Sequence, residues 1–197
     1  MKKLVSAVLI SSFFCFTAVA QSKFSLGPNA GLGHSWISNS DKAKFKLAAN
    51  AGVSLVYSAT EHFGVGLDAK YSYEGVKNTL TGSGTAASLD LNYFRFPLKA
   101  IYFFNNYGNP FRPKIFAGPS FGFLSTAKLN GTDVKNSFNS SDFGITGGAG
   151  FNYRLVKNSW FNADLSYLHG LSDLEKNVST KNHNRNLQLN VGVNFGL

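Results

Sequence analysis

The sequence predicts an all-β protein, an eight-stranded antiparallel up-and-down transmembrane β-barrel, and three observations lead to this fold. The stretch 187–197 places an apolar side chain at every second position, and a period of two is that of a β-strand. Its eleven residues are long for a soluble strand but match the roughly 9–11 residues of a strand that crosses a bilayer. Seven similar stretches precede it, and the links between the stretches alternate in length.

The N-terminus has the three parts of a secretory signal peptide. Lys2 and Lys3 form its charged region, residues 4–16 form its apolar core, and the segment Ala18-Val19-Ala20 has the small residues of a cleavage site. We therefore expect residues 1–20 to be removed, so that a barrel domain of residues 21–197 begins at Gln21. The chain has one cysteine, Cys15, and it lies inside the signal, so the mature domain can form no disulfide.

The strands follow one another along the mature chain. Their approximate ranges are 23–38, 45–57, 63–74, 88–103, 112–125, 142–153, 160–172 and 185–197. After a first short link, short turns near residues 58–62, 105–110 and 154–159 alternate with long links at 75–87, 126–141 and 173–184. Short turns on one side and long loops on the other are typical of outer-membrane barrels. Both termini then lie on the periplasmic side with the short turns.

One strand changes the phase of its alternation. In the range 88–103, Leu89, Leu91 and Tyr93 share one parity, whereas Phe94 and Leu98 are apolar on the other. A one-residue change of phase is what a β-bulge produces. We therefore expect a bulge near Tyr93 and a lipid-facing position for the apolar residues on both sides of it.

The alternation alone does not say which face points inward. In the alternative architecture, an exported soluble barrel of lipocalin type, the apolar face would surround a small apolar ligand. A soluble outer face would need many charged residues, whereas only 15% of the chain is charged and the non-apolar parity is dominated by Gly, Ser and Asn. Small side chains fit the lumen of an eight-stranded barrel. The composition therefore favours the membrane barrel.

Four segments resemble landmarks of a known family. They are Tyr93–Leu98, Ala117–Ser120, Gly147–Gly150 and Tyr167–Leu171, in this order and in the expected strands. Together they resemble the PorT-type outer-membrane β-barrel family of Bacteroidetes, although Arg95 stands where an acidic residue is common in that family. The resemblance implies an outer-membrane location and no established reaction. The secretion role of the family's namesake does not transfer through the fold.

Four histidines are the candidates for catalysis: His34, His62, His169 and His183. His62 and His183 fall at opposite ends of the expected barrel, and His34 and His169 fall on the lipid-facing parity. The chain has no His-x-x-x-His spacing, and its Gly-x-Ser-x-Gly match at 118–122 falls inside the expected strand 112–125, so it does not form the strand-to-helix turn of a nucleophile elbow. We expect no catalytic, metal or cofactor site, and an outer-membrane barrel enzyme that acts on lipid remains an alternative.

The inward parity carries the charges that the barrel must accommodate. It holds ten charged side chains, five of each sign: Lys46, Asp68, Lys70, Glu74, Asp90, Arg95, Lys99, Lys114, Asp142 and Asp164. Unpaired charges in a narrow interior are costly, so we expect a paired network that plugs the lumen. The alternative is that several of them are separately solvated charges in the two mouths.

The expected function is that of a non-enzymatic integral outer-membrane barrel, either structural or adhesive, or accessory to an envelope complex of the secretion type. Outer-membrane lipid is the expected partner. Other envelope proteins are candidate partners through the extracellular loops or the periplasmic turns. The net charge of +9 in an exported chain favours anionic lipid headgroups over nucleic acid, and no segment resembles a nucleic-acid-binding module.

Overall fold

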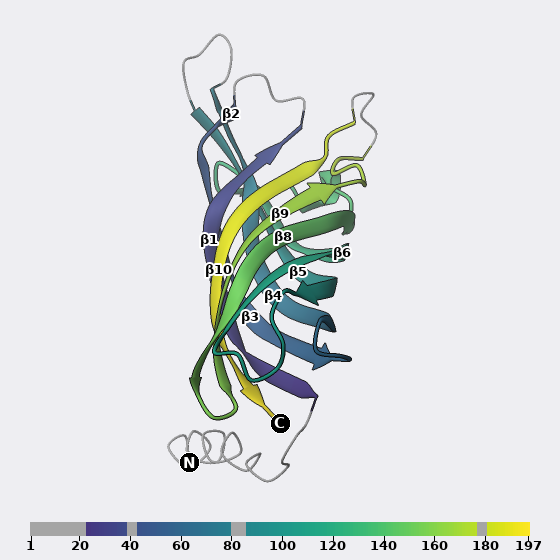
Figure 1. The fold of residues 1–197 in the computed structure, drawn as a ribbon. Helices are drawn as coiled ribbons and strands as arrows, with labels where there is room; N and C mark the ends of the chain where they lie inside the picture. Colours follow the sequence, from purple (N-terminus) through teal and green to yellow (C-terminus); the bar gives the residue numbers. More distant parts are fainter. Residues whose placement is uncertain (1–22, 39–42, 80–85, 177–180) are drawn as a thin grey trace, which may run out of the picture.

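The structure is a computed structural model, and it describes residues 23–38, 43–79, 86–176 and 181–197 (Figure 1). The predicted signal peptide and its cleavage site at Ala18, Ala20 and Gln21 lie outside these residues. No helix among the described residues is both long enough and apolar enough to cross a membrane.

Eight long antiparallel strands form a closed barrel, which confirms the predicted fold. The strands are β1 Phe24–Ile37, β3 Lys46–Ser58, β4 Phe63–Thr79, β5 Ala86–Phe103, β6 Phe111–Leu129, β8 Ser141–Val156, β9 Ser159–Gly170 and β10 Asn184–Gly196. Each strand pairs with its neighbours in this order, and β10 pairs with β1 to close the barrel. In the closing pair Leu32 lies opposite Leu189, so the last strand covers the free edge of the first.

The two ends of the barrel differ in their connections. At one end, here called the turn end, short turns join β3 to β4, β5 to β6 and β8 to β9, and β1 begins and β10 ends there (Figure 1). The other end, the loop end, carries three minor elements: β2 Ala43–Lys44, β7 Thr132–Asp133 and the 3-10 helix η1 Lys135–Ser137. The ladders of β4, β5 and β6 continue further toward the loop end than the alternation predicts.

The apolar parity faces outward along the barrel wall. Leu189 is 56% exposed, whereas its neighbour Asn190 is only 9% exposed. Large outward side chains with high exposure occur on the other strands as well, including Leu32, Leu47, Val65, Phe94, Ile115, Ile145 and Leu165. A lipocalin-like barrel would turn these residues inward, so the soluble alternative is wrong for this chain.

The β-bulge lies in a different strand from the predicted one. In β5 the inward parity continues without interruption from Leu91 through Tyr93 to Arg95, all of which are buried. The register instead shifts in the ladder between β5 and β6: Asn92 pairs with Thr126 and Tyr93 with Leu124, which leaves the extra residue on β6. The backbone of β5 keeps its phase, and only the polarity of its inward side chains changes, because the lumen is apolar at the loop end and polar further down.

Candidate functional site

The centre of the lumen is an ion-paired cluster of Arg95, Glu74 and Asp142, here called the central cluster. The Arg95 guanidinium contacts both carboxylate oxygens of Glu74, and its Nη2 lies 2.6 Å from Glu74 Oε2 and 2.6 Å from Asp142 Oδ2. Ser72 donates a hydrogen bond to Glu74 at 2.6 Å, and the Asn184 amide donates another. All three charged side chains are buried, and Glu74 is fully so. The cluster therefore ties β4, β5 and β8 together across the lumen.

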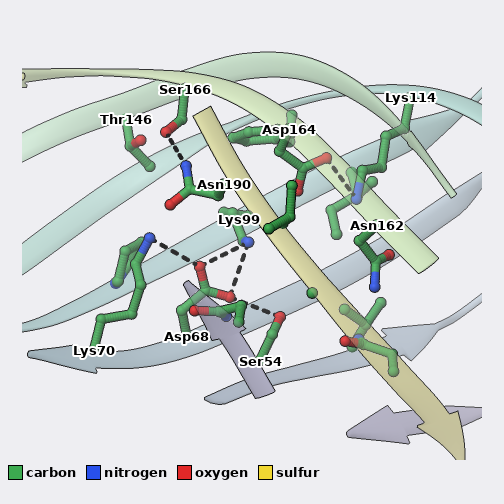
Figure 2. Close-up of a pocket in the computed structure, with 18 residues that line it drawn as sticks. Ser54, Asp68, Lys70, Lys99, Lys114, Thr146, Asn162, Asp164, Ser166 and Asn190 are labelled. Atoms are coloured by element: carbon green, nitrogen blue, oxygen red, sulfur yellow. Dashed lines mark hydrogen bonds and ion pairs between the residues drawn. The ribbon is translucent and has the colours of Figure 1, made fainter. Parts of the chain in front are cut away.

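A second group of charges lies nearer the turn end (Figure 2). It is here called the mid-lumen lysine cluster and consists of Asp68, Lys70, Lys99, Lys114 and Asp164. Asp68 accepts a hydrogen bond from Lys99 at 2.9 Å and one from the Ser54 hydroxyl at 2.8 Å. Lys70 lies 3.6 Å from the same carboxylate, on the other side of Asp68 from Ser54. The group surrounds a small cavity of about 40 Å³.

Lys114 and Asp164 form the other ion pair of this cluster, with 2.9 Å between their charged atoms. They come from β6 and β9, whereas Asp68 and Lys99 come from β4 and β5. The cluster therefore receives charged side chains from four strands, and each ammonium group has a carboxylate within ion-pair distance. This arrangement agrees with the general cost of leaving buried charges unpaired.

Buried amides line the lumen beside the two charged groups. The Asn50 amide donates to Gln188 Oε1 and to Asn190 Oδ1, both at 2.8 Å. The Asn190 amide in turn donates to the Ser166 hydroxyl at 2.9 Å. These hydrogen bonds therefore join side chains of β3, β10 and β9, and β9 also carries Asp164.

The loop end of the lumen is closed by an apolar group that the sequence analysis missed. This apolar plug consists of Ile37, Val76, Leu89, Leu91, Tyr93, Leu124, Ala127, Phe138 and Leu174. Phe138 and Leu174 come from the connections outside the barrel strands, and Asn139 N donates to Leu174 O at 2.8 Å. The plug rests on the central cluster, because the Arg95 guanidinium lies 4.7 Å from the centre of the Tyr93 ring.

The prediction that Leu89, Leu91 and Tyr93 face lipid is therefore wrong. Their side chains are at most 8% exposed and pack inside the barrel under Phe138 and Leu174. Apolar residues suit either a lipid-facing wall or a covered interior. The ordered connections make the interior dry at this end, so the apolar side chains turn inward.

The prediction that Asp90 faces the lumen is also wrong, because it followed from the same assignment of the two faces of β5. Asp90 alternates with the inward residues Leu89 and Leu91, so it lies on the outward face of β5, and its side chain is 29% exposed. The Lys46 ammonium pairs with Asp90 and donates to the Tyr73 hydroxyl at 2.8 Å. The β3–β4 ladder ends at Ala49 and Tyr73, which leaves the edge of β4 open to the Lys46 side chain.

Arg112 is a lumenal cation that the sequence analysis did not include. It shares the inward parity of β6 with Lys114 and is only 4% exposed. Its Nη2 donates to the Glu61 carbonyl at 2.6 Å and its Nε donates to the Asn105 carbonyl at 3.2 Å. Arg112 therefore joins two neighbouring turns at the turn end. Its shared parity with Lys114 was the sequence signal that could have identified it.

The histidines lie in separate surroundings. The His34 ring stacks on the rings of Trp36 and Phe45, and its centre lies 5.0 and 4.8 Å from their centres. Its Nδ1 accepts a hydrogen bond from the backbone N–H of Lys46. The His169 ring lies beside the Tyr167 hydroxyl at 3.4 Å. Within the described part of the chain, no group of three or more His, Cys, Asp or Glu side chains could hold a metal ion.

Comparison with known proteins identifies the family. The family model described as outer membrane protein beta-barrel domain matches residues 19–176, which is most of the chain. No curated protein matches the chain in sequence.

Several solved structures share the fold. Neisserial surface protein A is 20% identical, with a TM-score of 0.61, and the match covers 89% of this chain and 98% of that chain. OprG from Pseudomonas aeruginosa is 17% identical, with a TM-score of 0.63 and coverages of 87% and 94%. Outer Membrane Protein W of E. coli is 14% identical, with a TM-score of 0.53 and coverages of 89% and 97%. Given its closed barrel, its apolar outer wall and the family match, the chain belongs to the outer membrane protein beta-barrel domain family and lies in the cell outer membrane.

Proposed function

We propose that this small outer-membrane barrel is a non-enzymatic anchor with a plugged lumen, which meets other envelope components through its loops and turns. The observation that carries the proposal is the filling of the lumen. The central cluster spans the interior, and the apolar plug covers it at the loop end. An eight-stranded barrel is only wide enough for side chains to fill, so these layers leave no room for a pore.

The role is structural or adhesive, or accessory to a larger envelope complex. One feature at the loop end supports this role. The connection containing η1 is ordered against the connection after β9: Lys176 N donates to Ser137 O at 2.9 Å, and the Asn139 amide donates to Asp173 O at 2.8 Å. An ordered cap offers a partner a preorganised surface, which lowers the entropic cost of binding.

We further propose the PorT-type family as the finer assignment. It rests on the four segments Tyr93–Leu98, Ala117–Ser120, Gly147–Gly150 and Tyr167–Leu171, which lie in β5, β6, β8 and β9 in the same order, the last running one residue past the end of β9. Because the secretion role of the family's namesake does not transfer through the fold, the resemblance alone does not choose between adhesion and an accessory role in an envelope complex. Crosslinking in intact cells followed by purification of the barrel tests the accessory role. Recovery of envelope proteins of a secretion complex supports it, and recovery of none in repeated experiments argues for a purely structural or adhesive role.

Planar-bilayer recording tests the plugged lumen directly. The wild-type protein should show no steady single-channel conductance of porin size. A variant that opens both layers, Arg95→Ser combined with Leu91→Ser and Tyr93→Ser, should conduct more if it still inserts. Large, steady channels from the wild-type monomer, with a conductance proportional to salt concentration, would contradict the proposal.

A further inference from the structure

A cavity of about 490 Å³ opens at the turn end of the barrel, outside the plugged layers. We call it the turn-end cup and define it by Phe24, Phe103, Tyr107, Arg112, Asn152 and Trp160. Its volume falls within the range of about 300–1,000 Å³ that is typical of small-molecule sites. The cup would face the periplasm, since the short turns of an outer-membrane barrel lie on that side.

The floor of the cup is apolar. Ile101, Phe103 and Phe116 pack into one buried cluster, with Val56 against it. Val56 lines both this cup and the small cavity of the mid-lumen lysine cluster. The apolar cluster therefore lies between the cup and the charged lumen, and Asn194 lines both cavities beside Val56.

The residues that line the cup carry a net positive charge. Two cations, Lys23 and Arg112, line it, and no carboxylate is among its lining residues. Arg112 uses Nε and Nη2 to bind two backbone carbonyls, whereas its Nη1 makes no hydrogen bond with the described residues. In the same part of the chain no carboxylate lies within ion-pair distance of the guanidinium. Arg112 is the exception among the buried lumenal cations in this respect, since Lys70, Arg95, Lys99 and Lys114 all have such a partner.

Aromatic rings hold this guanidinium in place. Its central carbon lies 4.1 Å from the centre of the Phe103 ring and 4.9 Å from that of Tyr107. The N–H groups lie in the guanidinium plane, so those that bind no backbone carbonyl point from its edge. An edge with free N–H donors is the part of arginine that binds carboxylates.

We propose that the turn-end cup binds an organic anion from the periplasm, a carboxylate carried on an apolar or aromatic body. Arg112 binds the carboxylate through its free N–H groups. The rings of Phe24 and Trp160 contact the apolar body. The apolar floor lies between this site and the charged lumen.

The chain contains its own reporters for this proposal. Trp160 lines the cup, and the only other tryptophan, Trp36, lies toward the loop end of β1 and stacks on His34. The indole N–H signals of the full protein in lipid nanodiscs can be followed by NMR while phenylacetate is added. The Trp160 signal should shift and saturate, and the Trp36 signal should stay in place. Phenylacetamide, the neutral analogue of similar shape, should cause no saturable shift at the same concentrations.

Two variants test the role of the Arg112 charge. Asn152 lies directly opposite Arg112 in the β6–β8 ladder, so Asn152→Asp places a carboxylate beside the guanidinium with almost no change in shape. This variant should weaken phenylacetate binding about tenfold or more while the barrel folds normally, because charged hydrogen bonds contribute about 1.5–3 kcal/mol. Arg112→Gln should have the same effect on binding. Equal shifts with phenylacetate and phenylacetamide, unchanged binding by both variants, or no saturable shift at Trp160 would each overturn the proposal.

Discussion

Arg95 and Glu74 form a two-pronged ion pair at the centre of the barrel, in which a fully buried carboxylate meets a guanidinium that is only 3% exposed. Neither side chain can be removed without leaving the other charged and buried. Breaking such a pair costs about 3–5 kcal/mol, whereas a pair exposed to water contributes about 1 kcal/mol or less.

We therefore expect Arg95→Ala to lower the free energy of unfolding by about 3–5 kcal/mol. Urea unfolding of the protein in lipid vesicles measures it, with tryptophan fluorescence as the signal. Lys157→Ala, at an exposed position in the turn between β8 and β9, is the control and should change the free energy by about 0.5 kcal/mol or less. Equal values for the two variants would mean that Arg95 is solvated.

The second prediction concerns the outer, lipid-facing side of the barrel wall. Leu189 is 56% exposed on the closing strand, so Leu189→Arg should destabilise the inserted barrel by about 2–4 kcal/mol if the residue lies near the bilayer midplane. Leu189→Ile keeps an apolar surface and should cost less than about 1.5 kcal/mol. The same unfolding experiment in vesicles compares them. A tolerated arginine would show that Leu189 does not contact the hydrocarbon core.

The barrel and its faces could be predicted because each strand repeats the same binary pattern. The contrast between Leu189 and Asn190 on β10 recurs on β3, where Leu47 is 52% exposed and Asn50 is 6% exposed. A period-two pattern defines both the strand and its two faces, so the antiparallel barrel followed from the number of strands and the link lengths.

The apolar plug could not be predicted in this way. Leu91 is chemically the same residue in a dry interior as on a lipid-facing wall, so alternation alone assigns it to the wrong face. Its place depends on Phe138 and Leu174, which are distant in sequence and enter from loop-end connections. Asp90 was assigned to the lumen by the same error, because it alternates with Leu89 and Leu91, which were assigned to the lipid-facing side. The ion-pair partners of the charged residues could not be predicted either, because they lie on different strands and the spacing of residues along one strand does not show which side chains meet across the lumen.

The position of Leu91 can be tested by mutation. Leu91 is fully buried in the plug, so Leu91→Ala should leave a cavity and cost about 2–5 kcal/mol. Leu98 lies on the outward face of the same strand and is 42% exposed. Leu98→Ala should cost about 1 kcal/mol or less, because lipid can fill the vacated space. Thermal unfolding of both variants in nanodiscs measures the difference, and a similar small loss for each would place Leu91 against lipid.

The last prediction concerns the buried amides on β10. Asn190 and Asn186 share the inward face of this strand and are both buried, but only the Asn190 side chain is hydrogen bonded to side chains of other strands, those of Asn50 and Ser166. From the alternation alone, Asn190→Ser would be nearly silent, since serine is common on the inward parity. The structure changes that expectation, because a shorter side chain cannot reach both partners.

Asn190→Ser should therefore cost about 1–3 kcal/mol, which corresponds to one or two lost hydrogen bonds between buried groups. Asn186→Ser makes the same chemical change at a position where the side chain has no such partner, and it should cost less than about 1 kcal/mol. Urea unfolding in vesicles compares the pair, and hydrogen exchange of the Asn50 side-chain amide reports the loss of its bond directly. If both variants lose the same stability, the side-chain hydrogen bonds of Asn190 do not contribute to the stability of the barrel.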